Sequence, residues 1–151
     1  MRVLLTILSI PFFPLLLPAQ DATMARIKAV VADQYPGYMI DETEKESWCN
    51  GEHWMEVEIE KETDGADDEL TLLFDTEGTL RYVESSIIPA GMPSAVKDTY
   101  RQACPKCREP NEVDVLTAQD GSPDLFEIEV RKGLRERTFL IDANGKLLCR
   151  E

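Results

Sequence analysis

Two stretches of the chain alternate between apolar and charged residues. In residues 54–60, Met55, Val57 and Ile59 alternate with glutamates, and residues 125–131 show the same alternation. A period of two places successive side chains on opposite faces of a β-strand. The pattern therefore predicts two strands, each with one buried face and one face in water.

Segments with helical periodicity precede both strands. Ile27, Val30 and Val31 recur at helical spacing in the first segment, as do Val96 and Tyr100 in the second. A proline follows each segment, and proline favours the end of a helix because it lacks an amide donor and restricts the residue before it. We expect one helix with an apolar stripe before each alternating strand.

A further apolar segment follows each alternating strand, at residues 70–74 and 138–141. It leads into an Asp-x-x-Gly sequence, at residues 75–78 and 142–145, and a last short strand is expected beyond this turn. Glycine readily adopts the positive φ that a tight hairpin turn requires. The segment after each helix is less regular, although alternation around residues 113–115 indicates another strand in the second half.

These elements occur twice in the same order, which indicates an internal duplication. We predict an α+β protein of two tandem units, residues 21–88 and 89–151, each a helix followed by an antiparallel meander of three or four strands. The helices would pack on one face of an antiparallel sheet, because each helix and each sheet has one apolar side to bury.

Residues 1–20 differ from the rest and read as a signal peptide. A positive start at Arg2 is followed by an uncharged apolar run over residues 3–17 and a small-residue exit near residues 18–22. The run is shorter than the ~20 residues that span a bilayer. We expect cleavage, a periplasmic or secreted protein, and no membrane span afterwards. A retained anchor and a buried N-terminal element remain alternatives.

Acidic residues dominate the charge. The chain has 16 Lys and Arg against 29 Asp and Glu, and cleavage beyond Arg2 would leave 15 against 29, a formal charge of −14. This surface would repel a phosphate backbone, so nucleic acid is excluded as an expected partner, and anionic membranes are disfavoured. A basic protein or peptide fits better. The alternative is that the charge only keeps an exported protein soluble.

The cysteines of an exported domain are candidates for disulfides. Three pairings are open to the four residues, which are Cys49, Cys104, Cys107 and Cys149. The Cys104–Cys107 pair also forms a Cys-x-x-Cys sequence, which in other proteins supports thiol–disulfide exchange. Here the pair follows a helix, whereas an activated thiol is typically found at a helix N-terminus. Zinc would need a second such pair.

No catalytic, cofactor-binding or metal-binding group stands out. His53 is the only histidine and has no sequence signature of a catalytic triad around it. The two Asp-x-x-Gly sequences lack the later carboxylate of a calcium loop and favour hairpin turns. We therefore predict a protein that is not an enzyme and holds no cofactor.

Three short motifs resemble the PepSY-like group, which includes the β-lactamase-inhibitor-like exported proteins. They are a helix ending in Tyr35-Pro36-Gly37, the strand at residues 54–59 and the turn sequence at residues 73–80. The second half departs from the pattern, with Cys-Pro-Lys-Cys at residues 104–107. The resemblance implies an exported, non-catalytic fold of helices on an antiparallel sheet. It also implies a binding or inhibitory role toward a protease or an envelope enzyme.

The alternating glutamates form the candidate binding surface, because the same motif occurs in both halves. The residues of this expected partner-binding face are Trp54, Glu56, Glu58, Glu60, Glu127 and Glu129. The leading hypothesis is a non-catalytic binding protein that docks a basic partner on this face. An ordinary solvated face, a thiol–disulfide redox protein using Cys104 and Cys107, and a structural envelope protein are the alternatives. The sequence leaves the oligomeric state open.

Overall fold

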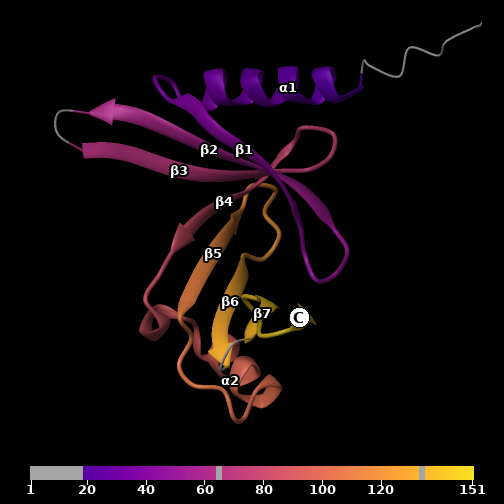
Figure 1. Ribbon diagram of the computed structural model, residues 1–151, viewed down its shortest axis with the longest axis vertical. Helices are drawn as coiled ribbons and strands as arrows, with labels where there is room; N and C mark the ends of the chain where they lie inside the picture. Colours follow the sequence, from indigo (N-terminus) through magenta and orange to yellow (C-terminus); the bar gives the residue numbers. More distant parts are fainter. Residues whose placement is uncertain (1–18, 64–65, 133–134) are drawn as a thin grey trace, which may run out of the picture.

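The computed structural model describes residues 19–63, 66–132 and 135–151 (Figure 1). Residues 1–18 of the expected signal peptide therefore lie outside the described residues. Within these ranges no helix is long and apolar enough to cross a membrane. The elements are α1 (Ala19–Gln34), β1 (Met39–Ser47), β2 (His53–Thr63), β3 (Ala66–Phe74), β4 (Leu80–Ser86), the 3-10 helix η1 (Pro89–Gly91), α2 (Ser94–Ala103), β5 (Glu112–Ala118), β6 (Leu125–Lys132), β7 (Arg135–Asp142) and β8 (Leu147–Arg150).

One antiparallel sheet contains all eight strands of the described chain, in the order β1 to β8. The expectation of two tandem helix-plus-meander units is wrong. β4 pairs with β5 from Tyr82 opposite Ala118 to Ser86 opposite Asp114, so no sheet edge separates the two halves. If the two halves formed separate sheets, β4 and β5 would each expose a row of unpaired backbone donors and acceptors. The β4–β5 ladder satisfies these groups. Local sequence similarity carries no information about this pairing.

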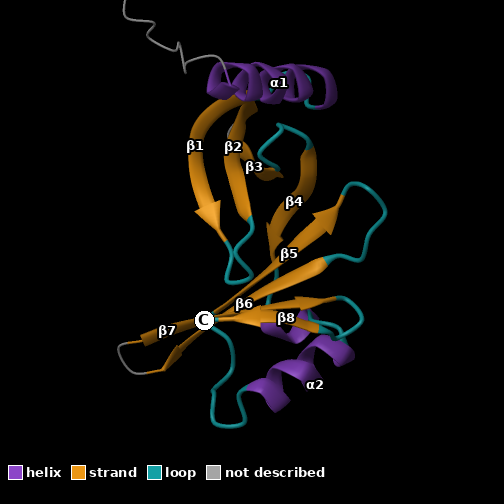
Figure 2. Cartoon of the chain, turned by 90° about the vertical axis from the view of Figure 1, so that its right-hand side faces the viewer, coloured by secondary structure: helices purple, strands orange, loops and turns teal. Residues whose placement is uncertain are grey.

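Both helices cover the same face of this sheet, which we call the covered face. Figure 2 shows α1 over β1, β2 and β3 at one end and α2 near β8 at the other. The register places Val57 opposite Leu72 and Leu72 opposite Val83, and the same face continues through β5 to β7. Under α1, the buried residues are Ile27, Val31, Val57, Ile59, Leu72, Phe74 and Leu80. Under α2 they are Met92, Val96, Tyr100, Cys104, Val113, Phe126, Ile128, Val130, Phe139 and Ile141. The twist of the sheet carries the two helices to opposite ends of the molecule.

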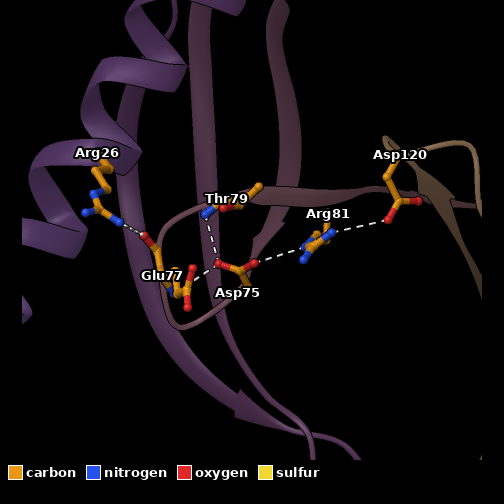
Figure 3. A network of polar contacts seen from close by, with 6 residues as sticks. All are labelled: Arg26, Asp75, Glu77, Thr79, Arg81 and Asp120. Atoms are coloured by element: carbon orange, nitrogen blue, oxygen red, sulfur yellow. Dashed lines mark hydrogen bonds and ion pairs between the residues drawn. The ribbon is translucent and has the colours of Figure 1, made fainter.

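The two Asp-x-x-Gly turns connect the sheet to its helices. The Asp75 carboxylate accepts hydrogen bonds from the amides of Glu77 and Thr79, and its other oxygen pairs with Arg81 at 3.0 Å (Figure 3). Partial burial opposes ionisation of Asp75, but these donors outweigh it and lower the pKa of the carboxyl. Arg26 of α1 donates to the Glu77 carbonyl, so the turn also holds the helix.

The second turn repeats this arrangement at α2. The Asp142 carboxylate accepts from the amides of Asn144 and Lys146, and Thr99 of α2 donates to the Gly145 carbonyl at 2.5 Å. Gly145 has a φ of +84° and lies against the helix backbone at Ala95. Each turn thus fixes one helix on the covered face.

Candidate functional site

The face of the sheet opposite the helices, which we call the open face, is lined with carboxylates. The register places Glu56 between Glu44 of β1 and Leu73 of β3, and it places Glu127 between Asp114 of β5 and Leu140 of β7. Following the ladders in this way assigns to the open face Glu42, Glu44, Glu46, Glu56, Glu58, Glu60, Glu62, Glu69, Glu84, Glu112, Asp114, Glu127, Glu129, Glu136 and Asp142. All the glutamates predicted for a binding face are in this set, brought together from β2 and β6.

The open face is concave. A disulfide joins Cys49, just beyond β1, to Cys149 in β8, with 5.6 Å between their Cα atoms. β1 and β8 are the two outer strands of the sheet, so this bridge requires the sheet to curl around the open face. A cavity of about 180 Å³ lies inside the curl, with Glu46 on one side and Glu127 and Thr138 on the other.

A small apolar cluster fills one end of the open face. Its buried members are Trp48, Leu73, Leu116, Leu125 and Leu140. Trp54 packs against it, with its ring centroid 4.6 Å from that of Trp48 and 5.5 Å from that of Tyr82. The Trp54 indole N–H is buried and has no hydrogen-bond partner among the described residues. Trp54, expected to face a partner, is thus largely part of the protein's own packing.

Burial and mutual repulsion raise the pKa values of the central carboxyls. The pKa of Glu127 is raised to about 8, first by burial and then by Glu46 and Glu84. The pKa of Glu84 is raised to about 7, again first by burial and then by the charges of Asp114 and Glu56. Burial is the first cause, and neighbouring carboxylates the second, of the raised pKa values of Glu46, Glu56, Glu58 and Glu129.

Few groups within the chain compensate this charge. Asp114 is only 8% exposed and accepts a hydrogen bond of 2.6 Å from the Ser86 hydroxyl. Arg131 is the one cation that the register places on the open face of the described strands, and it pairs with Glu136 at 3.6 Å near the end of the β6–β7 hairpin. The arrangement can bind cationic side chains, since the carboxylates at its centre form no ion pair with another described residue.

Sequence reasoning missed Glu46, Glu84 and Asp114, which lie at the centre of the cluster. A signal was present for Asp114, because Val113 and Val115 flank it in an alternating strand. β1 and β4 gave weaker signals. β1 is exposed along most of its length, so its open-face glutamates are hard to tell from charged residues on its other side.

The four cysteines form two disulfides, which confirms the expectation of disulfides and selects one of the three pairings. The Cys104–Cys107 bridge closes the loop after α2. Cys104 is only 6% exposed and belongs to the core under α2. It also lies at the negative end of the helix dipole, which disfavours a thiolate. This environment gives the redox alternative no support.

Two kinds of catalytic arrangement, a metal cluster and a triad around His53, are absent from the described residues. No group of three or more His, Cys, Asp or Glu side chains in the described ranges could hold a metal ion. Ser47 and His53 form a hydrogen bond of 2.7 Å between their side chains across the β1–β2 pair. Both residues are exposed, and among the described residues no third side chain orients the other ring nitrogen of His53, as a catalytic triad requires.

The fold so defined is a single curled antiparallel sheet with helices on one face and an acidic concave face on the other. Known proteins share this fold at low sequence identity. A DUF2874 family protein from Bacteroides uniformis aligns over 84% of this chain and 87% of its own, with a TM-score of 0.53 and 13% identity. A protein from Bacteroides eggerthii described as a candidate periplasmic protein aligns over 83% and 86%, with a TM-score of 0.53 and 12% identity.

A BLIP-like protein from Bacteroides fragilis aligns over 84% of both chains, with a TM-score of 0.48 and 16% identity. No family model matches the chain, and no curated protein matches it. The resemblance to the PepSY-like group therefore stays a prediction, and what is shared with the solved structures is the fold.

Proposed function

We propose that this protein is an exported, non-catalytic binding protein that docks a basic protein or peptide on its open face. The observation that carries the proposal is the carboxylate cluster around Glu84 and Glu127, because the register places a single cation, Arg131, on the same face of the described strands. A cationic partner would complete this surface by charge complementarity.

The cluster is unfavourable for the isolated protein. A carboxyl whose pKa is raised on folding destabilises the folded state at every pH above its ordinary pKa. An ordinary solvated face would keep its carboxylates apart and exposed, whereas Glu84, Glu127 and Asp114 are half-buried or buried beside one another. Perturbed groups gathered in a concavity are typical of functional sites.

The partner is proposed to be a protein of the envelope or the surroundings, and inhibition of a protease or envelope enzyme is one form that docking would take. The expected signal peptide and the two disulfides support an oxidising compartment. The concave shape favours a protruding segment of the partner that carries lysine or arginine.

The proposal is tested by charge reversal on matched surfaces. The variant Glu58→Lys/Glu129→Lys changes two open-face positions, and Asp33→Lys/Asp98→Lys makes the same change in charge on exposed helix positions. Each protein is immobilised and used to capture partners from an envelope extract. We expect a basic protein to be retained by the unaltered and helix variants and lost by the open-face variant. The same capture by all three would contradict the proposal.

A further inference from the structure

A second concavity lies on the helix side of the molecule, away from the open face. It has a volume of about 470 Å³ and is enclosed by α2, by η1 and the residue after it, and by the loop that follows α2. We propose that this pocket binds a small anionic organic ligand, a carboxylate or sulfonate attached to an apolar body. Because the pocket and the open face share no residues, this proposal is independent of the proposed docking function.

The charge of the pocket is opposite to that of the protein. Lys97, Arg101 and Arg108 line it, and Glu109 is the only acidic residue among its lining residues. The whole chain carries 29 acidic and 16 basic residues, so three cations against one acid form a local reversal of sign. Lys106 adds a further exposed cation on the same loop. An anion would be attracted here and repelled by most of the remaining surface.

The carboxyl end of α2 would by itself disfavour an anion, because its free carbonyl groups carry partial negative charge. Two of these carbonyls are occupied. The Cys107 amide donates to the Cys104 carbonyl at 3.0 Å, and Arg150 of β8 donates to the Ala103 carbonyl at 3.5 Å. These contacts reduce the opposition of the helix end, and the three basic side chains add attraction for an anion.

Three links hold the walls of the pocket to α2. The Tyr100 hydroxyl donates to the Arg108 carbonyl at 2.7 Å, and the Cys104–Cys107 disulfide closes the same loop. On the other side, Lys97 donates to the Ala90 carbonyl at 2.8 Å. A lysine has three donors, so Lys97 retains two for a ligand. A pocket held open in this way loses little conformational freedom on binding.

The remaining walls are apolar and suit the body of such a ligand. Met92 is a buried lining residue, and prolines 89, 105 and 110 line the pocket with little hydrogen-bonding capacity. The volume lies in the range of small-molecule sites, ~300–1,000 Å³. A ligand that combines an aromatic or aliphatic body with one anionic group matches both parts of the lining.

The test uses two fluorescent probes that differ in charge. The purified protein is titrated with 8-anilinonaphthalene-1-sulfonate and with the uncharged N-phenyl-1-naphthylamine. We expect saturable binding of one sulfonate probe, at least about tenfold tighter than binding of the neutral probe. The variant Arg101→Gln/Arg108→Gln should weaken sulfonate binding by about tenfold. Arg135→Gln/Arg137→Gln removes the same charge from exposed positions of β7 and should leave binding unchanged.

Backbone amide NMR shifts of the unaltered protein locate the probe without any variant. Shifts confined to residues 89–110 support the proposal. Three results would overturn it: equal affinity for both probes, equal weakening by the two double variants, or shifts around residues 45–55 and 75–76, where another cavity of about 490 Å³ lies.

Discussion

The two faces of the sheet differ in how they contribute to stability. The covered face buries aliphatic and aromatic side chains under α1 and α2, and this burial stabilises the fold. The open face gathers carboxylates and raises the pKa values of Glu84 and Glu127, which destabilises the fold at neutral pH. A surface that opposes folding while the opposite surface drives it is typical of a site kept for binding.

Both faces nevertheless contain a packed apolar cluster. They differ in the contacts that keep each cluster in place. On the covered face, helices are fixed by the turns at Gly78 and Gly145. On the open face, the cluster around Trp48 is held by the Cys49–Cys149 bridge between the outer strands. The curl of the open face thus depends on a covalent link across 100 residues.

The largest expected effect comes from removing that link. Cys49→Ser/Cys149→Ser should lower the free energy of unfolding by about 4 kcal/mol, because a disulfide that closes a long loop restricts the unfolded chain most. The Cys104–Cys107 bridge on the helix side closes a much shorter loop, with a sequence separation of 3. The variant Cys104→Ser/Cys107→Ser should therefore lower the free energy of unfolding by only about 2 kcal/mol. Denaturant unfolding of both variants measures the difference. Equal losses would mean that the bridge across the open face has no special role.

The next effect tests how the covered face fixes its helices. A Cβ at Gly145 would lie 2.8 Å from the Ala95 carbonyl oxygen, and one at Gly78 would lie 3.1 Å from that of Thr23. Gly51 has the same φ of +84° with nothing within 4 Å of a Cβ. Gly145→Ala should lower the free energy of unfolding by about 3 kcal/mol, and Gly78→Ala should lower it somewhat less. Gly51→Ala should lower it by only ~1–2 kcal/mol, the cost of placing a residue with a Cβ in a left-handed backbone conformation.

Thermal or denaturant unfolding of the three glycine variants separates two contributions to the loss of stability. One is the clash between an added Cβ and the helix backbone, and the other is the strain of a positive φ. If Gly51→Ala were as destabilising as Gly145→Ala, backbone strain alone would explain the effect. The contact between turn and helix would then not be what anchors α2.

A smaller effect of opposite sign is expected on the open face. Folding raises the Glu127 pKa from 4.5 to about 8, so the folded protein binds more protons than the unfolded chain between these values. Stability therefore falls as the pH rises through this window. Glu127→Gln should leave the stability at pH 5 nearly unchanged and raise it at pH 8.5 by about 2 kcal/mol, less than the full shift implies because neighbouring carboxyls titrate together.

Denaturant unfolding at the two pH values measures this gain. Asp98→Asn, which removes one exposed carboxylate from α2, is the control and should change stability by less than about 0.5 kcal/mol at either pH. Loss of stability in Glu127→Gln at pH 8.5 would contradict the view that the open face opposes folding.

Much of the fold follows from short-range pattern. Residues 54–60 and 125–131 lie in β2 and β6, and the alternation correctly predicts that Val57, Ile59, Ile128 and Val130 face the covered side. Trp54 and Leu125, at the start of the two stretches, lie instead in the apolar cluster of the open face. The segments with helical periodicity became α1 and α2, and glycines 78 and 145 adopt the expected positive φ. β1 was only weakly indicated, because exposed charged residues on both of its sides hide its alternation.

The candidate site was predictable only in part. Glu56, Glu58 and Glu60 could be placed on one face because they share a strand, and so could Glu127 and Glu129. That Glu84 and Asp114 lie between the two groups required knowledge of the β4–β5 pairing. The packing of Trp54 against Trp48 and Tyr82 was not predictable either, since tertiary structure brings these rings together.

The sequence alone determined the local elements and the side of each strand that is buried, because these depend on spacings of two to four residues. It also determined the excess of acidic charge. Only the tertiary structure decided that the halves share one sheet and that the outer strands meet at Cys49 and Cys149. It also decided that carboxylates of β1, β2, β4, β5 and β6 converge around Glu84 and Glu127 on one concave face. Those features depend on contacts between residues far apart in the chain. Strand pairing and the exclusion of water from buried carboxylates arise only once the whole chain has folded.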